Sequence, residues 1–469
     1  MMADMDPVSL SQDSDTQKRQ AAAAPKSVQF YITRRAFLRV AGVLGLVFGA
    51  GLHNACGDTK LRRSLVRPEI APRKIPPALV VGLEIGTSKI CIAVGERWRD
   101  GRINLLSVSQ APAVGVRNGE IVDLKAVVKC LRDALVDAET KSDVLIRSIS
   151  VGVTGAHIQS FNNSGVVFLR EARDSVSAED IEATRIKARD VNIPMRNDFL
   201  HFRAQRYQVD DQLCVLDPIG LPGQKLKADF HIIYGERTRL LKTIRCVKEL
   251  PLELEDVVFA PLASAEVLLT QNQKNRGALV IDLGAGTTGY VLYVDGAATQ
   301  SGMLPSGGDQ ITNDLSIGLR MPWERAETLK IESGSAMAGS SLVDAEDPRA
   351  LHEWGGRFSD AEIMHVIIYL RLRATLEKVK ARLVEKGARF DQLGGGIYLT
   401  GGSSLQRGVV ELTSEVFGVP AFGGTAKGFD GDESVVQNPQ YSCAIGLLKL
   451  SGWKSESDVC LNTGRRYLV

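Results

Sequence analysis

Two segments of the chain place a carboxylate at the end of an apolar strand and a glycine-rich turn directly after it. In the first, a strand that starts at Ala78 ends at Glu84, and a second strand follows the turn. Further along the chain, the same order of strand, acid, turn and strand recurs around Asp282. Such a repeat predicts two similar α/β halves that face each other. The turn residues are Gly86, Thr87, Ser88 and Lys89 in the first segment, and Gly284, Gly286, Thr287 and Thr288 in the second.

The residue types in these turns suit phosphate binding. Glycines let a ligand approach the backbone, and successive N–H groups form an anion-binding concavity to which Thr and Ser hydroxyls add donors. A carboxylate repels phosphate, so a divalent cation or bound water must lie between them. We therefore expect Asp282 to hold the water shell of a Mg²⁺ ion, with Glu84 as its partner. The alternative, two ordinary β-hairpins with glycine turns, does not explain why the acid recurs in register.

Further glycine-rich elements lie in the second half of the chain. A strand from Gly396 leads into Gly401, Gly402 and Ser403, and an amphipathic helix is expected from near Ser404 to Phe417. Gly307 and Gly308 precede a helix expected over 309–319. Small residues at a helix N-terminus suit a phosphate or a sugar. A long helix is expected over 360–386, because Ser359 and Glu362 form a capping box and an apolar stripe follows them.

Composition indicates an ordinary globular protein. The chain has 469 residues, a formal net charge of +2 and 44% hydrophobic residues, and its length predicts about two to four domains. This near-neutral balance gives no case for nucleic acid as a partner. The seven cysteines are scattered without a CxxC pair, which favours reduced thiols in a cytosolic core over disulfides or a metal site.

In this order, the two turns and the Gly401 element resemble the phosphate-1, phosphate-2 and adenosine motifs of the actin-like ATPase superfamily. Glu84, where most of the superfamily has Asp, makes the chain similar to the FtsA family of bacterial cell-division proteins, as do the segments 216–221, 259–265 and 439–447. The resemblance implies an α/β fold, the actin-like ATPase fold of two duplicated ribonuclease-H-like halves with a small SHS2-type insert domain. It also implies ATP and Mg²⁺ as cofactors, with Glu327 and Lys330 at the ribose and base.

The resemblance also implies a division into domains. The insert spans 157–238, where short β-like runs surround one helical stretch, Ala178–Arg189, that Ser177 can cap. In the family the insert mediates self-association and contact with later division proteins. The expected parts are an extension 1–77, a first half 78–156 and 239–276, the insert, a second half 277–452 with a small subdomain at about 314–395, and a polar tail 453–469.

The resemblance implies an ATP-binding division protein that polymerises and binds the C-terminal peptide of FtsZ. It would link FtsZ filaments to the cytoplasmic face of the inner membrane at the division site and recruit later division proteins. ATP is expected to act as a switch with at most weak hydrolysis, since no residue is identified that orients or deprotonates a water; the catalytic residues are unknown. Two alternatives share the fold: a PilM-like type IV pilus assembly protein and a sugar-kinase-like phosphotransferase. No sugar-binding constellation supports the latter.

The first 76 residues differ from the rest, with twelve Lys/Arg against six Asp/Glu. Within them, Thr33–Arg39 and the apolar run Val40–Leu52 resemble a twin-arginine export signal, and the run is shorter than the ~20 residues that span a bilayer. Three interpretations stay open: an export signal, a segment that associates with anionic membrane, or an artefact of the assigned start codon. Because the tail shows no amphipathic helix of the kind that usually anchors the family, Arg34–Leu52 is a candidate to replace it.

Overall fold

The computed structural model describes residues 77–169, 175–210, 215, 217–337 and 359–451. The sequence-based interpretations of Arg34–Leu52 and of the tail 453–469 therefore fall outside the described residues. Within those residues, no helix is both long and apolar enough to cross a membrane.

The first half is built on a six-stranded sheet with the order β10-β6-β1-β2-β3-β16. β1 runs antiparallel to β2 and parallel to β6, and β2 runs antiparallel to β3. The strands are β1 (Ala78–Ile85), β2 (Lys89–Arg97), β3 (Ile103–Pro112), β6 (Ser148–Val153), β10 (Glu253–Phe259) and β16 (Phe429–Asp430).

The second half repeats this topology. Its sheet has the order β13-β12-β11-β14-β15, which matches β3-β2-β1-β6-β10 strand for strand. β11 likewise runs antiparallel to β12 and parallel to β14. The duplication that the repeated acid and turn predicted is thus confirmed. The strands are β11 (Ala278–Leu283), β12 (Thr288–Val294), β13 (Ala297–Leu304), β14 (Gly396–Thr400) and β15 (Ala421–Gly423).

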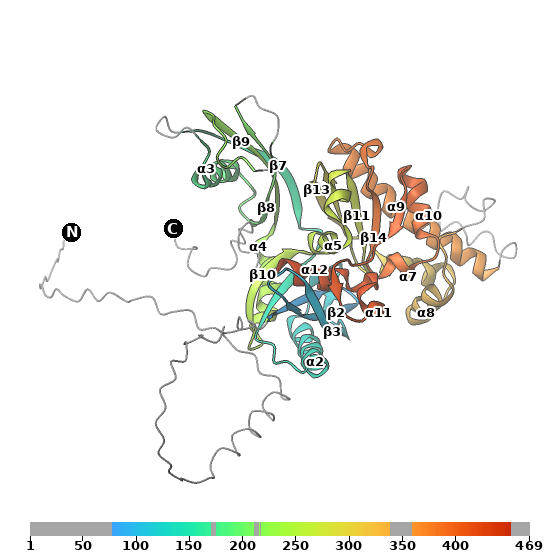
Figure 1. The fold of residues 1–469 in the computed structure, drawn as a ribbon. Coiled ribbons are helices and arrows are strands. Elements are labelled where there is room, and N and C mark those ends of the chain that lie inside the picture. The colour runs from blue at the N-terminus through green and yellow to red at the C-terminus, as the bar shows by residue number, and fades with distance from the viewer. Residues whose placement is uncertain (1–76, 170–174, 211–214, 216, 338–358, 452–469) are drawn as a thin grey trace, which may run out of the picture. The chain divides into compact units, whose positions relative to one another are not determined.

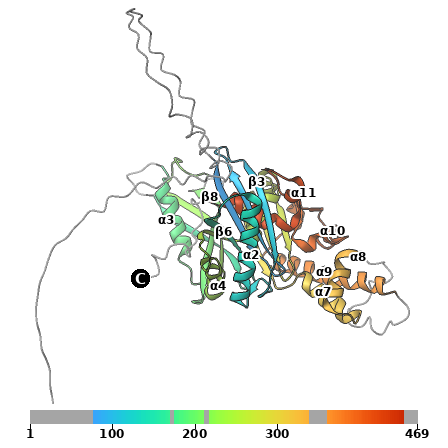
Figure 2. The ribbon, with the colours of Figure 1, turned by 90° about the horizontal axis from the view of Figure 1, so that it is seen from below.

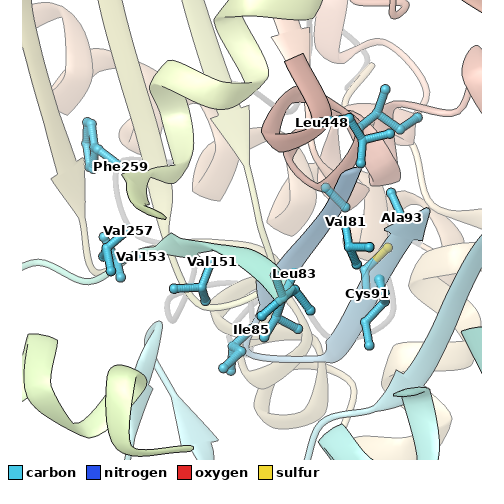
Figure 3. Close-up of a cluster of buried hydrophobic side chains, with 14 of the residues drawn as sticks. Val81, Leu83, Ile85, Cys91, Ala93, Val151, Val153, Val257, Phe259 and Leu448 are labelled. Carbon is cyan, nitrogen blue, oxygen red and sulfur yellow. The ribbon is translucent and has the colours of Figure 1, made fainter. Parts of the chain in front are cut away.

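Two helices, α5 (Ala260–Leu268) and α12 (Ser442–Leu450), pack against each other between the sheets (Figure 1). α12 contacts β1, β2 and β6, whereas α5 also contacts β11 and β12. Their approach requires a glycine, because a Cβ at Gly446 would overlap the Ala263 carbonyl group. Side chains of β1, β2, β6, β10 and α12 form the apolar core of the first half beside this pair (Figure 3).

Helices also cover the outer faces. In the first half α2 (Leu124–Ser142) packs on β2 and β3 (Figure 2), on the side of the sheet opposite α12 (Figure 1). The central strand β2 is buried from Ile90 to Gly95 because both of its faces are covered. In the second half the long helix is confirmed as α9 (Asp360–Glu385), with the expected capping box of Ser359 and Glu362. It packs on α7 (Gly308–Gly318) and α10 (Val409–Phe417), and α7 packs on α8 (Trp323–Ser333).

Shorter elements complete the two halves. A two-stranded ribbon joins the end of β3 to α2, and α4 follows the insert. The bounds are β4 (Val116–Arg117), β5 (Glu120–Ile121), α4 (Arg237–Lys248), α6 (Gln271–Asn275), α11 (Glu433–Val436) and the 3₁₀ helices η3 (Phe390–Gln392), η4 (Gly402–Leu405) and η5 (Pro439–Tyr441).

Between β6 and α4 the chain forms a separate three-stranded antiparallel sheet of order β7-β9-β8, with one helix, α3 (Ala178–Arg189), against it. The helix has the expected bounds, and Ser177 caps it through a box with Asp180. Gly165 lets α3 approach β7, since a Cβ there would overlap the Thr184 carbonyl oxygen. The strands are β7 (Gln159–Phe168), β8 (Asn197–Val209) and β9 (Lys225–Glu236).

Polar side chains of the insert satisfy carbonyl groups of β13, the edge strand of the second sheet. Ser160 Oγ donates to Ser301 O at 2.7 Å, and Asn162 Nδ2 donates to Thr299 O at 3.0 Å. Buried His231 joins both sides, with Nδ1 2.7 Å from Asn162 Oδ1 and Nε2 2.8 Å from Ser301 Oγ. The insert, covalently part of the first half, is therefore hydrogen-bonded to the second.

We predict that this contact is acid-sensitive. Burial lowers the pKa of His231 from 6.5 to about 3, with Lys386 and Arg203 adding to the effect. The unfolded chain therefore binds the proton more readily than the folded one, and stability falls as the pH drops below 6.5 towards 3. The free energy of unfolding of the wild type should fall between neutral pH and about pH 5, and His231→Gln should make this fall smaller by about 2 kcal/mol. Urea unfolding at both pH values measures this, and an unchanged difference would contradict it.

Candidate functional site

A cavity of about 600 Å³ lies between the two halves, a size typical of small-molecule sites. The elements that line it include the β1–β2 turn, the β11–β12 turn, η4 and α8. The cavity thus lies where the repeated carboxylates and turns of the two sheets meet.

The two turns are closed in the same way. Gly86 N donates to Lys89 O and Gly284 N donates to Thr287 O, both at 2.9 Å. In the described part of the chain, the backbone N–H groups of Thr87, Ser88 and Ala285, which line the cavity, donate to no protein acceptor. These amides are available to an anionic ligand, as expected of a phosphate-binding turn.

The turns also touch each other. A Cβ at Gly286 would lie 2.6 Å from Thr87 Oγ1 and 2.9 Å from Asn118 Cα, so the second turn needs a glycine where it meets the first. Thr87 Oγ1 is fixed in turn, because it accepts a hydrogen bond from Gly119 N at 2.9 Å. This contact sets the spacing of the two halves on one side of the cavity.

The side chains of Glu84 and Asp282 line the cavity, where both residues are half-buried and their carboxylates have few polar partners. Glu84 Oε2 has no hydrogen-bond partner among the described residues, while Asp282 Oδ2 accepts a bond from Ser264 Oγ at 3.0 Å. Burial raises the pKa of Glu84 to about 7, with the charge of Asp282 adding to the rise and that of Lys89 opposing it. Burial likewise raises the pKa of Asp282, against the Ser264 hydrogen bond and Lys89.

These carboxylates fit a hydrated divalent cation. Lys89 Nζ donates to Gln440 O at 2.7 Å and to Gln440 Oε1 at 3.3 Å. These hydrogen bonds fix the ammonium group beside Gln440. Across the described residues, no group of three or more His, Cys, Asp or Glu side chains is arranged to hold a metal. Two oxygen ligands supplemented by water and ligand phosphates match the usual coordination of Mg²⁺.

The third glycine-rich element closes the cavity beside Asp282. Gly401 has φ 84°, and a Cβ there would lie 2.5 Å from Asp282 Oδ1, so only glycine fits. Ser403 Oγ donates to Gly284 O at 3.2 Å. The predicted start of the helix near Ser404 is wrong, because α10 begins only at Val409. The 3₁₀ helix η4 ends at Leu405, and Gly408 before α10 has a φ of 77°. The Arg407 carbonyl breaks the helix, because it accepts a bond from Ala336 N at 2.7 Å.

Glu327 and Lys330 line the cavity from α8. Buried Lys330 Nζ donates to Glu327 Oε2 at 2.7 Å, to Thr312 Oγ1 at 2.8 Å and to Gly308 O at 3.2 Å. The lysine therefore holds α8 against α7 while it faces the cavity. A ribose- and base-binding role for this pair stays a prediction.

Three of the sequence-derived binding residues do not line the cavity: Gly286, Thr288 and Gly307. Thr288 is fully buried and donates to Ser306 O at 2.7 Å, since it begins β12 at the position that Ile90 takes in β2. Near Gly307, the N–H groups of Gly308 and Asp309 donate to Gly284 O and Ala285 O, so they position the second turn.

The other sequence-derived residues do line the cavity: Glu84, Gly86, Thr87, Ser88, Lys89, Asp282, Gly284, Thr287, Gly308, Glu327, Lys330, Gly401, Gly402 and Ser403.

Sequence reasoning missed several lining residues, among them Thr154, Gln406, Arg407 and Gln440. Thr154 follows β6, a parallel strand next to β1, so its position at the same sheet edge was the available signal. Gln440 lies in a segment that was noted only for its resemblance, with no sign that it would reach Lys89.

Two family models and the similar curated proteins all indicate the same family. A family model described as cell division protein FtsA matches residues 279–446, and one described as the SHS2 domain inserted in FtsA matches 155–234. The chain is 35% identical over 367 residues to cell division protein FtsA of Neisseria meningitidis serogroup B, covering 78% of this chain and 88% of that one. It is 31% identical over 379 residues to FtsA of Escherichia coli K12, covering 79% and 89%.

Among solved structures, the fold is similar to the PilM–PilN type IV pilus biogenesis complex. The TM-score is 0.54 at 18% identity, covering 80% of this chain and 98% of that one. At this identity the likeness concerns the fold, which is the actin-like one that the repeated motifs predicted.

We predict that Gly286→Ala destabilises the protein by about 1–3 kcal/mol, because the added methyl group separates the two turns. Gly423→Ala is the matched control. A Cβ at Gly423 would meet no heavy atom within 4 Å, so this substitution should change stability by less than about 0.5 kcal/mol. Urea unfolding of both variants tests this, and equal effects would show that the turns are not in tight contact.

Proposed function

The chain belongs to the FtsA family of cell division proteins, and from this premise we propose that it binds ATP with Mg²⁺ in the cavity between its halves. The observation that carries the proposal is the pair of half-buried carboxylates, Glu84 and Asp282, between two turns whose amides are not hydrogen-bonded within the described residues. The alternative of two plain β-hairpins leaves the burial of Glu84 Oε2 without a physical reason.

The chain's own residues have separate tasks in this proposal. The amides of Thr87, Ser88 and Ala285 bind phosphate oxygens, and Asp282 and Glu84 hold the cation's water ligands. Bound Mg²⁺ supplies positive charge that offsets the repulsion between carboxylates and phosphates. Because the ligand bridges both halves, it stabilises their closed arrangement, so ATP acts as a switch. No described residue is assigned to hydrolysis.

We further propose that the protein polymerises, links FtsZ filaments to the cytoplasmic face of the membrane at the division site, and recruits later division proteins. Sequence similarity to FtsA proteins over about four fifths of the chain supports this. The insert is the proposed surface for self-association and for other division proteins. Similarity to the PilM–PilN complex is limited to the fold, so a pilus role is the second candidate.

Calorimetry on Asp282→Asn tests the cation site. Removing this charge should weaken binding of ATP with Mg²⁺ by about 10–100-fold, the effect typical of groups that position a metal. Binding of ATP in excess chelator should be unchanged or tighter, because a repulsive charge is gone.

Asp391→Asn is the control, since this exposed carboxylate is paired with Arg389 outside the cavity. It should bind like the wild type under both conditions. If Asp282→Asn weakened ATP binding equally with and without Mg²⁺, the result would contradict a cation at this site.

Binding of the FtsZ C-terminal peptide tests the adaptor role. The full chain should bind the labelled peptide in a fluorescence anisotropy titration, and a scrambled peptide of the same composition should not bind. Failure to bind the peptide would contradict the adaptor role and favour the pilus role. It would not bear on the proposed nucleotide site.

A further inference from the structure

The tip of the β4–β5 ribbon contacts both glycine-rich turns of the cavity. Gly119 N donates to Thr87 Oγ1 of the first turn at 2.9 Å. A Cβ at Gly286 in the second turn would lie 2.9 Å from Asn118 Cα. Thr154, which follows β6 and lines the cavity, donates through Oγ1 to Gly119 O at 3.2 Å. The two residues of the tip are therefore held against the two turns and the end of β6.

The local sequence allows this close approach. Asn118 and Gly119 both adopt left-handed backbone conformations, with φ of 49° and 73°. Asn followed by Gly is the dipeptide that favours a two-residue hairpin turn with positive φ at both positions. A Cβ at Gly119 would also lie 2.7 Å from Thr154 Oγ1 and 3.1 Å from Thr287 Cγ2, so a larger residue would push the tip away from the turns.

Directly after the tip, β5 is held by α4, the helix that follows the insert. Glu120 forms an ion pair with Arg239 in the first turn of α4. Lys242 Nζ, one turn further along the helix, donates to Ile121 O at 3.4 Å. Arg239 also pairs with Glu236, the last residue of β9, at 2.9 Å. The guanidinium group of Arg239 thus joins the ribbon to the last strand of the insert.

This ion pair lies where the chain enters and leaves the insert. The chain enters through residues 154–158, between β6 and β7, and leaves from β9 into α4 at Arg237. The two crossings are hydrogen-bonded to each other, since Glu236 N donates to His157 Nδ1 at 3.2 Å. Arg237 in turn pairs with Asp198 of β8 at 2.6 Å. A displacement of the start of α4 is therefore transmitted to the insert.

The position of the ribbon depends on these contacts at its two sides. Each of its strands has two residues, so the ribbon's own ladder contributes little to holding it. The side chains of Glu120 and Arg239 are 26% and 39% exposed, so their attraction is less screened by water than that of a fully exposed pair. A constraint on the tip is consequently felt at Arg239.

We propose that Arg239 is a positioning residue that couples nucleotide binding in the cavity to the insert, through Glu120 and the ribbon tip. The inference rests on the ATP binding of the proposed function and adds how that site is regulated. A nucleotide on the two turns fixes the tip, and the ion pair carries this constraint to the start of α4. Because coupling is reciprocal, whatever holds the insert in the same arrangement also tightens nucleotide binding.

Hydrogen exchange of the full chain with and without ATP and Mg²⁺, followed by mass spectrometry, tests the coupling. In the wild type, residues 115–121 and 236–243 should gain protection together with the turn 86–88. In Arg239→Gln the turn should still gain protection, whereas 236–243 should gain none. Arg239→Lys keeps a positive charge beside Glu120 and should restore part of this protection.

Calorimetry with ATP and Mg²⁺ measures the size of the coupling. Arg239→Gln and Glu120→Gln should each weaken binding about 3–10-fold, because the ribbon no longer holds the first turn in place. The double variant should lose no more than either single variant, since all three lack the same contact. Arg206→Gln is the matched control, because Arg206 pairs with Asp229 within the insert, and it should bind ATP like the wild type.

Three outcomes would overturn the coupling: additive losses in the double variant, protection of 236–243 that persists in Arg239→Gln, or no response of 236–243 in a wild type whose turns are protected by ATP. Equal weakening by Arg206→Gln would show that the loss is not specific to this ion pair. Absence of ATP binding by the wild type would contradict the nucleotide site itself, and this inference with it.

Discussion

The partial burial of two carboxylates, Glu84 and Asp282, in a shared cavity is the main energetic cost that this fold has to accommodate. An ionised carboxylate removed from water costs several kcal/mol unless other groups compensate it. Here Glu84 Oε2 has no hydrogen-bond partner among the described residues, and Lys89, the nearby positive charge, already donates to Gln440. A fold optimised only for stability would not retain such a pair, whereas a site that binds a hydrated cation requires it. Burial accordingly raises the pKa of Glu84 to about 7.

The architecture presents this pair by duplication. Each half ends its central strand with the acid and closes the following turn through the same backbone hydrogen bond, Gly86 to Lys89 and Gly284 to Thr287. α5 and α12 cross closely between the sheets because Gly446 admits the Ala263 carbonyl group. The insert adds a second link, since its polar side chains bind the edge of β13. A ligand that bound both halves would therefore also act on the hydrogen bonds between the insert and β13.

Much of this was predictable from the sequence because the signals are local. The acid, glycine and hydroxyl spacing predicted both turns, a capping serine predicted the start of α3, and a capping box predicted the start of α9. Longer-range features were not predictable in this way. Thr288 belongs to the same motif as Thr287 but is buried in β12, because the strand has already begun there. The helix after Ser403 starts late, since Arg407 bonds to Ala336, a residue far away in the sequence. Gln440 reaches Lys89 across 351 positions, a contact that no local pattern encodes.

In the proposed function both turns hold one ligand at the same time. Hydrogen exchange followed by mass spectrometry, with and without ATP and Mg²⁺, measures this directly on the unmodified chain. The turns 86–88 and 284–287 should gain protection together, over the same range of ATP concentration, because their amides bind one triphosphate. Protection of one turn alone, or of neither at concentrations where heat of binding is detected, would contradict a shared clamp.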